Sequence, residues 1–434
     1  MLRYTPAPAS LYKRHRKLLT KQLEPGALAI VHSNDVMPTN ADGTLGFKQN
    51  ADLLWLSGID QEETILLLFP DAPDPAHREI LFVRETTPHL VIWEGHKLTK
   101  EQATAASGID NVQWTSAFPG LLQTLMTQAS SIWMTTNEHP RHTSEVQTRN
   151  DRENAAIRAK YPLQTYRRLA PLLYRLRMTK DAKELAQLQK AANITAEGFR
   201  ALLPQIKPGM GEWEVEGILA GEFIRRASRG FAYPPIVASG PNACVLHYVT
   251  SHCPCEKGQV LLLDVGAEYG NYNADLTRAV PVSGRFTKRQ RAVYDSVLRI
   301  LRHCEKSLRP GTTLKAYTEE ALLVLADELG KLGLAKAADL RKKEGKLAAA
   351  RKYMPHGFSH HIGLDVHDVA IAGASVEAGH VYTIEPGIYL PDEGFGIRLE
   401  NDYLIGRKKN TNLLADAPIE ADEIENLMAS KSAK

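Results

Sequence analysis

The chain contains little cysteine and no long apolar run, and each absence excludes a class of protein. Only four of the 434 residues are cysteines, too few for a disulfide-stabilised secreted scaffold, so we expect reduced thiols. No stretch approaches about 18 consecutive apolar residues, which predicts no transmembrane helix and no membrane partner. Lys and Arg within the first 19 residues are not followed by an apolar segment, so we predict no secretory signal and a cytoplasmic location.

A large excess of charge of one sign is also absent. Lys and Arg number 53 and Asp and Glu number 50, a net charge of +3, whereas a nucleic-acid-binding protein usually has a stronger basic excess. The most basic local run, residues 341–352, also contains several alanines, and we interpret it as the solvated surface of a helix. The sequence therefore predicts no nucleic-acid partner.

The composition is that of a globular protein, and its length predicts two to three domains. In the first third, residues 27–32, 64–69 and 80–84 are short apolar runs bounded by turn residues, a pattern typical of buried strands. Together they predict an α/β domain with a parallel or mixed sheet.

A polar, charged stretch at residues 143–158 indicates that this first domain ends within it or shortly after it. Thr179 is expected to be the N-cap of a helix, because apolar residues recur at helical spacing after it. We therefore divide the chain into a first domain at residues 1–175 and a second at residues 176–434.

Four acids of the second domain lie in apolar, strand-like segments joined by turns. If two strands pair around a turn at Tyr269 and Gly270, Asp264 lies opposite Asp275. In the same way, two strands that pair around a turn at residues 390–394 place Glu385 opposite Glu400. Directly opposed side chains have Cβ atoms about 4.5–5.5 Å apart, so each pair brings two carboxylates together.

Opposed like charges destabilise a sheet, so positive charge must compensate them. Arg398 lies on the same strand face as Glu400 and can pair with one acid, but its single positive charge cannot neutralise four carboxylates. Two divalent ions about 3.5–4 Å apart accept bridging carboxylates and a shared water. The pairs therefore predict a dinuclear metal site.

A glycine-punctuated segment adds four histidines within twelve residues: His356, His360, His361 and His367. The spacing of His356 and His360 is that of a zincin helix, but Gly357 stands where the zincin glutamate is required, which argues against that class. A single histidine is usually structural, whereas four in one loop favour a site.

The acids and one histidine, with their flanking segments, resemble the five metal ligands of the pita-bread metallopeptidases: Asp264, Asp275, His360, Glu385 and Glu400. Within that fold, residues 47–58 and 356–367 are similar to signature segments of the aminopeptidase P family. The sequence departs from the family pattern at four positions, none of which is a ligand: Lys48, Ser251, His361 and Asn401.

The resemblance implies a fold and an activity. It implies an N-terminal α/β domain of the creatinase and aminopeptidase P type, followed by a pita-bread (α+β) catalytic domain. The implied activity is release of an N-terminal residue that precedes proline, through a hydroxide bridging two divalent ions. Carboxylates and one imidazole suit Mn²⁺, Fe²⁺ or Co²⁺. The resemblance implies manganese among these, and Zn²⁺ is left open.

The resemblance also implies roles for single residues. Asp264 would bind one ion, His360 and Glu385 the other, and Asp275 and Glu400 would bridge. Four further side chains match cleft positions and, with Glu385, form the expected catalytic set: His247, His356, His367 and Arg398. His247 and His367 would steady the scissile carbonyl and the oxyanion, and a structural hydrogen bond is the alternative for each.

Other interpretations stay open. Proline offers no N–H, so a site selective for it is expected to enclose its ring, and Tyr389 is either a wall of that site or a core residue. Prolidase, which cleaves Xaa-Pro dipeptides, shares all five ligands, and a non-catalytic pita-bread binding module is a more remote alternative. The resemblance further implies a homodimer or homotetramer formed through the N-terminal domain, where Trp55 and Trp93 are core or interface residues.

Overall fold

The computed structural model describes residues 3–430, which form two compact units. One unit spans Pro6–Arg177. The other spans residues 178–430 and includes residues 3–5. None of the described helices is long and apolar enough to cross a membrane, and all four cysteines are free thiols.

The unit at Pro6–Arg177 is built on a six-stranded sheet. Its strands, in spatial order, are β6 (Asn111–Trp114), β5 (Glu79–Val83), β4 (Ile65–Leu68), β1 (Ala27–His32), β7 (Ser131–Met134) and β8 (Tyr166–Arg168). β4 is antiparallel to β1 and to β5, and the other pairs are parallel. The predicted mixed sheet is therefore confirmed, and each of the three predicted strands is found to within one residue at either end.

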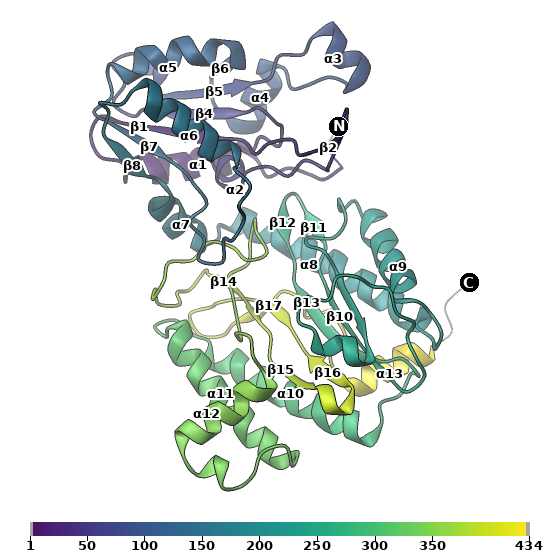
Figure 1. The fold of residues 1–434 in the computed structure, drawn as a ribbon. Helices are drawn as coiled ribbons and strands as arrows, with labels where there is room; N and C mark the ends of the chain where they lie inside the picture. Colours follow the sequence, from purple (N-terminus) through teal and green to yellow (C-terminus); the bar gives the residue numbers. More distant parts are fainter. Residues whose placement is uncertain (1–2, 431–434) are drawn as a thin grey trace. The chain divides into compact units, whose positions relative to one another are not determined.

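Helices cover both faces of this sheet (Figure 1). Leu28 and Ile30 of β1 pack with residues of α5 (Phe118–Met126) and α6 (Arg149–Lys160). α2 (Ala51–Ser57) packs on β1 and β4 from the other face, with α1 (Ala9–Thr20) against it. All residues of β1 are buried because the strand is covered on both sides. The remaining elements are β2 (Pro38–Asn40), β3 (Gly43–Thr44), α3 (Pro88–Trp93), α4 (Lys100–Ser107) and α7 (Ala170–Met178).

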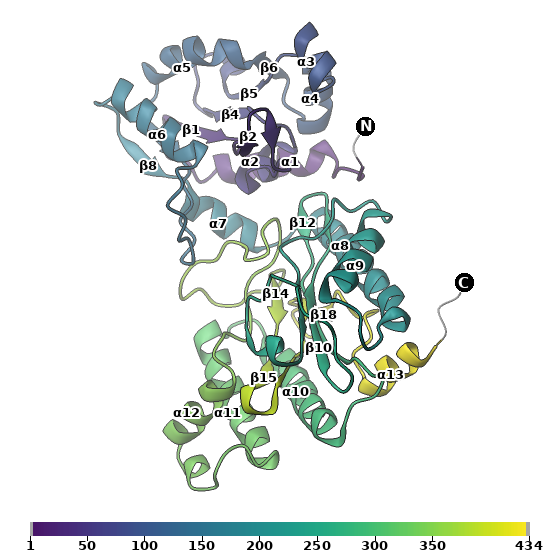
Figure 2. The same cartoon turned by 45° about the vertical axis from the view of Figure 1, so that its right-hand side comes forward.

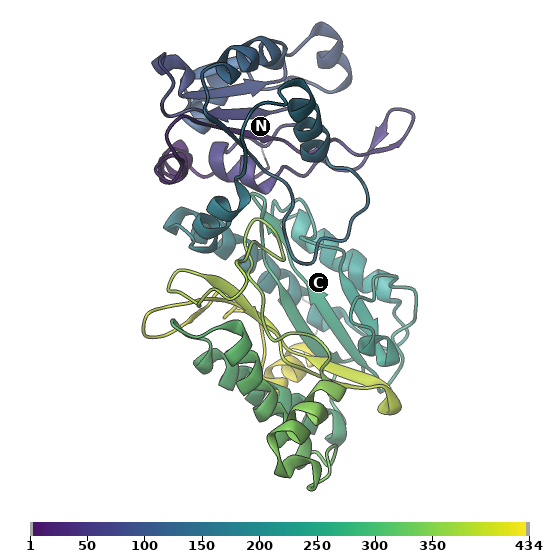
Figure 3. The ribbon, with the colours of Figure 1, turned by 60° about the vertical axis from the view of Figure 1, so that its left-hand side comes forward.

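The second unit contains two small sheets that lie side by side, with the strands of residues 260–281 next to those of residues 381–404 (Figure 3). One sheet has the order β13 (Leu276–Pro281), β10 (Val260–Val265), β9 (Ile236–Ser239). The other has the order β14 (Val381–Ile384), β17 (Asn401–Leu404), β18 (Thr411–Asn412). Two short hairpins extend them: β11 (Glu268–Tyr269) with β12 (Tyr272–Asn273), and β15 (Gly387–Leu390) with β16 (Phe395–Arg398).

Two groups of helices flank these strands (Figure 2). α8 (Ala182–Leu202) contacts β11 and β12, and α9 (Glu212–Ile224) contacts β9. α10 (Lys288–Ser307) contacts β14, β15 and β16, and α11 (Leu314–Lys331) packs on α10. α12 (Lys343–Tyr353) carries the basic run and buries only Ala350, as predicted for a solvated helix. α13 (Ala421–Ala429) follows the last strand.

The predicted N-cap of α8 is wrong by two residues. Asp181, not Thr179, caps the helix: its side chain accepts from the backbone N–H of Lys183, and Glu184 accepts the backbone N–H of Asp181 in return. This reciprocal pair satisfies more of the free N–H groups of the first turn than a threonine alone can. Thr179 instead forms an isolated β-bridge with His380.

Candidate active site

The first predicted pair of opposed acids has a different register. In the β10–β13 ladder Asp264 lies opposite Thr277, not Asp275. The turn is formed by Gly270 and Asn271, whose φ angles are 59° and 68°, as a two-residue type I′ turn requires. The prediction that Asp264 faces Asp275 is therefore wrong by two residues, because the turn lies one residue later than expected.

The two aspartates nevertheless meet, at the side chain of Tyr233. The Tyr233 hydroxyl lies 2.6 Å from Asp264 Oδ1 and 2.7 Å from Asp275 Oδ1. A hydroxyl has one hydrogen, so it can donate to only one of these carboxylates at a time. Tyr233 therefore links the end of β10 to the residue before β13.

The second predicted pair is in the expected register. Ile384 pairs with Asn401 and Gly387 with Arg398, which places Glu385 opposite Glu400 between them. The ladder is interrupted there, and the Glu400 N–H donates to Thr277 O at 3.1 Å. Glu400 thus connects the second sheet to β13 of the first, which brings both acid pairs to one place.

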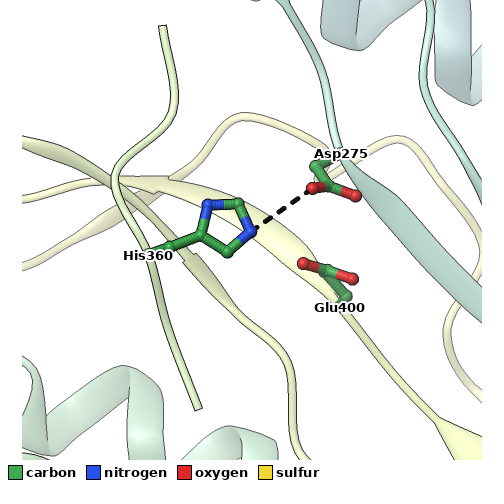
Figure 4. Close-up of side chains that lie close together, drawn as sticks. All are labelled: Asp275, His360 and Glu400. Carbon is green, nitrogen blue, oxygen red and sulfur yellow. Dashed lines mark ion pairs between the residues drawn. The ribbon is translucent and has the colours of Figure 1, made fainter. Parts of the chain in front are cut away.

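Three of the predicted ligands form a tight cluster (Figure 4). Asp275, His360 and Glu400 each offer a ligand atom, and these atoms lie within 4.8 Å of one another. His360 Nε2 is 3.6 Å from Asp275 Oδ2 and 3.8 Å from Glu385 Oε1. With Asp264 joined through Tyr233, the structure brings all five predicted ligands together.

The charges of this cluster are poorly balanced by the protein alone. Burial raises the pKa of Asp275 and of Glu400 well above the usual range, and the neighbouring carboxylates raise both further. Burial also acts to raise the pKa of Glu385, but a hydrogen bond with His356 and nearby positive charge bring it to about 2. Several buried carboxylates with one imidazole fit divalent cations, which supply the missing positive charge.

Arg398 is the cation that the protein does provide. It is buried, donates from Nη1 to the Tyr389 hydroxyl at 2.9 Å and from Nε to Thr277 Oγ1 at 3.1 Å, and forms an ion pair with Asp264. Its Nε is 3.9 Å from Glu400 Oε2. The closest carboxylate partner of Arg398 is therefore Asp264, and not the Glu400 that its strand position indicated.

The other predicted histidines differ in their contacts. His356 lies 2.7 Å from the Tyr389 hydroxyl through Nε2 and 3.4 Å from Glu385 Oε2 through Nδ1. The exposed ring of His367 lies 4.4 Å from the ring of His360, nearly perpendicular to it. His247 is exposed, and no hydrogen bond or ion pair joins it to any residue that the structure describes.

Three residues of the site were missed by the sequence reasoning. Tyr233 offered no local signal, and Thr277 and Asp402 are polar residues within the strands β13 and β17. Thr277 Oγ1 donates to Glu400 Oε2 at 2.6 Å, and Asp402 Oδ2 accepts the Asp275 N–H at 3.0 Å. A polar side chain two residues from a predicted ligand in a predicted strand is the signal that could have identified the last two.

A buried ion pair packs against the histidine loop. Lys180 Nζ is 2.8 Å from Asp368 Oδ2, and both side chains are almost fully buried. The Asp368 N–H donates to His361 O at 2.9 Å, and the His361 ring lies 4.0 Å from that of Tyr382. A Cβ at Gly363 would lie 2.2 Å from Asp368 Oδ2, so the loop needs glycine there. This packing holds the loop on which His360 lies.

Comparison with known proteins agrees with this geometry. Residues 186–407 match metallopeptidase family M24, and residues 12–133 match the aminopeptidase P N-terminal domain. The chain is 32% identical to Xaa-Pro aminopeptidase of Escherichia coli (strain K12), with 96% of this chain and 97% of that protein covered. It is also 32% identical to Xaa-Pro aminopeptidase 3 of Mus musculus, over 93% of this chain and 81% of that protein.

Solved structures show the same fold. A proline aminopeptidase P II from Yersinia pestis has a TM-score of 0.86 at 32% identity and covers 97% of this chain and 99% of its own. A zinc-substituted E. coli aminopeptidase P in complex with product has a TM-score of 0.87 at 31% identity, over 98% and 99% of the two chains. The N-terminal aminopeptidase P domain and the M24 catalytic domain therefore place this chain in the aminopeptidase P family of M24 metallopeptidases.

Proposed function

We propose that this chain is an aminopeptidase that hydrolyses the bond between an N-terminal residue and a following proline, with two divalent ions. The observation that carries the proposal is the cluster of Asp275, His360 and Glu400, in which both acids are buried, extended by Asp264 and Glu385. The E. coli relative is named Xaa-Pro aminopeptidase and the mouse relative Xaa-Pro aminopeptidase 3, and these names support the substrate class.

The four acids and the histidine would hold the ions in the roles that the resemblance implies. Bound there, the ions would lower the pKa of a shared water and polarise the scissile carbonyl. Manganese as the resident ion, a homodimeric or homotetrameric state and a cytoplasmic location stay predictions of the sequence.

The remaining side chains have tasks of their own in this proposal. Arg398 and His356 both contact the hydroxyl of Tyr389, at 2.9 and 2.7 Å, and so lock that ring. His367 and His247 are exposed, so each is accessible to a bound peptide. We assign both to the scissile carbonyl and the oxyanion, where a preorganised hydrogen-bond donor contributes most.

The test compares three peptides in the presence of Mn²⁺: Xaa-Pro-Yaa, Xaa-Pro and Xaa-Ala-Yaa. Release of the first residue from Xaa-Pro-Yaa alone, lost on chelation and restored by metal, is the expected result. Cleavage of the dipeptide alone would change the assignment to prolidase. If none is cleaved and no ion binds, the non-catalytic binding module becomes the better description.

Two variants separate the site from the fold. Glu400→Gln removes a predicted ligand and is expected to abolish both bound metal and hydrolysis. Asp392→Asn changes an exposed acid at the turn of the same hairpin and is expected to leave both unchanged. Bound metal is counted by elemental analysis of the purified protein.

A further inference from the structure

Glu212 is a buried carboxylate whose partners are all neutral. It is the first residue of α9 and is fully buried, and no ion pair joins it to a cation among residues 3–430. Burial acts to raise its pKa, but the hydrogen bonds that its carboxylate accepts together outweigh this, so the pKa lies below its usual value. A helix N-terminus also favours negative charge.

Five hydrogen bonds to this carboxylate come from one segment, residues 239–253. Oε1 accepts from Ser239 N at 2.7 Å, from Ser239 Oγ at 2.9 Å and from Asn242 Nδ2 at 3.1 Å. Oε2 accepts from the Tyr248 hydroxyl at 2.7 Å and from Cys253 N at 2.9 Å. The backbone adds a sixth link, because the Glu212 N–H donates to Cys253 O. The carboxylate of one side chain is therefore hydrogen-bonded to the start, the middle and the end of the segment.

This segment carries His247, which has no anchor of its own. His247 is exposed and makes no hydrogen bond with the described residues, whereas the next residue, Tyr248, is held by Glu212. The position of the imidazole thus depends on how the backbone around it is fixed.

The same segment packs against the site. Ala243 and Tyr248 lie in one apolar cluster with Tyr389, the residue that contacts His356 and Arg398. A Cβ at Gly396 of β16 would lie 2.6 Å from Ala243 O, so this glycine allows the close approach. A shift of the segment would therefore change its distance from Glu400, which follows β16, and from Asp264 of β10.

We propose that Glu212 is a positioning residue for His247, which it holds in place through the hydrogen bonds that its carboxylate accepts from residues 239–253. This inference rests on the proposed function, since His247 acts only if the peptide bond is cleaved here. A carboxylate is needed because both oxygens accept. In glutamine an NH₂ group replaces one of these two oxygens, and it would face the donors that bond that oxygen in the wild type.

The test is Glu212→Gln, with Glu214→Gln as the matched control on the same helix turn. Glu214 accepts only the Gly211 N–H, a bond that glutamine also makes in a capping box. For Glu212→Gln we expect kcat to fall about 10- to 100-fold through misplacement of a catalytic group, with KM and the number of bound metal ions nearly unchanged. Glu214→Gln is expected to behave as the wild type.

Hydrogen exchange gives a readout that needs no activity. The amides of Ser239 and Cys253 are expected to exchange faster in Glu212→Gln and at the wild-type rate in Glu214→Gln. Tyr248→Phe removes one donor and keeps the carboxylate, so it is the second variant if Glu212→Gln does not fold. We expect it to give a smaller loss of kcat in the same direction.

A double-variant comparison decides whether Glu212 acts through His247. If it does, Glu212→Gln lowers kcat in the wild-type background and has little further effect in His247→Ala. Equal losses in both backgrounds, or faster exchange with unchanged kcat, would overturn the inference while the proposed function stands. A wild-type chain that cleaves no Xaa-Pro peptide would overturn the proposed function, and this inference with it.

Discussion

The hydroxyl of Tyr233 lies 2.7 Å from Asp275 Oδ1, and the same hydroxyl is 2.6 Å from Asp264 Oδ1. A side chain some thirty residues before the first acid thus aligns two acids that the β ladder does not pair. Replacing a group that orients metal ligands in this way typically lowers metal affinity or activity about 10- to 100-fold.

Replacing this tyrosine tests its role directly. Tyr233→Phe keeps the ring and removes the hydroxyl, so we expect metal affinity to fall about 10- to 100-fold. Competition with a chromogenic chelator measures it. Tyr353→Phe is the control, because that hydroxyl bonds the Leu334 carbonyl beside α12 and has no acid partner. Equal affinity in the two variants would show that the acids align without Tyr233.

Arg398 is expected to need its guanidinium and not only its charge. It reaches Tyr389, Thr277 and Asp264 from three different nitrogens, a geometry that the single ammonium group of lysine cannot reproduce. We expect Arg398→Lys to lower kcat/KM at least about tenfold, as lost charge-assisted hydrogen bonds of about 1.5–3 kcal/mol imply. The exposed Arg407→Lys is the control, and wild-type kcat/KM in Arg398→Lys would mean that charge alone suffices.

The ion pair of Lys180 and Asp368 should be costly to break from one side. Lys180→Met leaves a buried carboxylate without its cation, which destabilises a protein by about 3–5 kcal/mol. Removing both charges in Lys180→Met/Asp368→Leu is expected to recover much of this loss. Chemical unfolding of the metal-free chain measures both. A single variant as stable as the wild type would show that the pair is solvated.

His32 predicts an acid sensitivity of the unit at Pro6–Arg177. Burial, and then the charge of Arg149, lower its pKa to about 3, and neither ring nitrogen has a hydrogen-bond partner. The unfolded chain binds a proton below about pH 6.5, whereas the folded one does not until about pH 3. The free energy of unfolding therefore falls as pH decreases through this window.

The variant His32→Leu removes this titrating group and should make the free energy of unfolding depend less on pH. We expect it to lose less stability than the wild type between pH 6.5 and about pH 4, measured by urea unfolding at each pH. The exposed His96→Leu serves as the control and should keep the wild-type slope. The same slope in His32→Leu would mean that His32 is solvated in the folded state.

Local patterns determined much of this protein. Apolar runs between turn residues predicted β1, β4 and β5, and the Pro- and Gly-bounded turn after residue 390 predicted the register that sets Glu385 opposite Glu400. Strand periodicity and turn chemistry involve neighbours in the chain, so they are visible without the fold. The resemblance of short motifs to a known family supplied the set of five residues that the structure brings together.

Only the tertiary structure decided what depends on residues distant in the sequence. Two consecutive left-handed residues moved the first turn by one position, so Asp264 pairs with Thr277. Tyr233, Asp402 and Glu212 bond partners that lie 27 to 127 residues away in the chain, and Arg398 of one sheet pairs with Asp264 of another. The sequence by itself determined several strands, the turn after residue 390 and the ligand types that the chain carries. Packing decided which side chains hold the predicted ligands in place, because hydrogen bonds between distant segments produce no periodic pattern in the sequence.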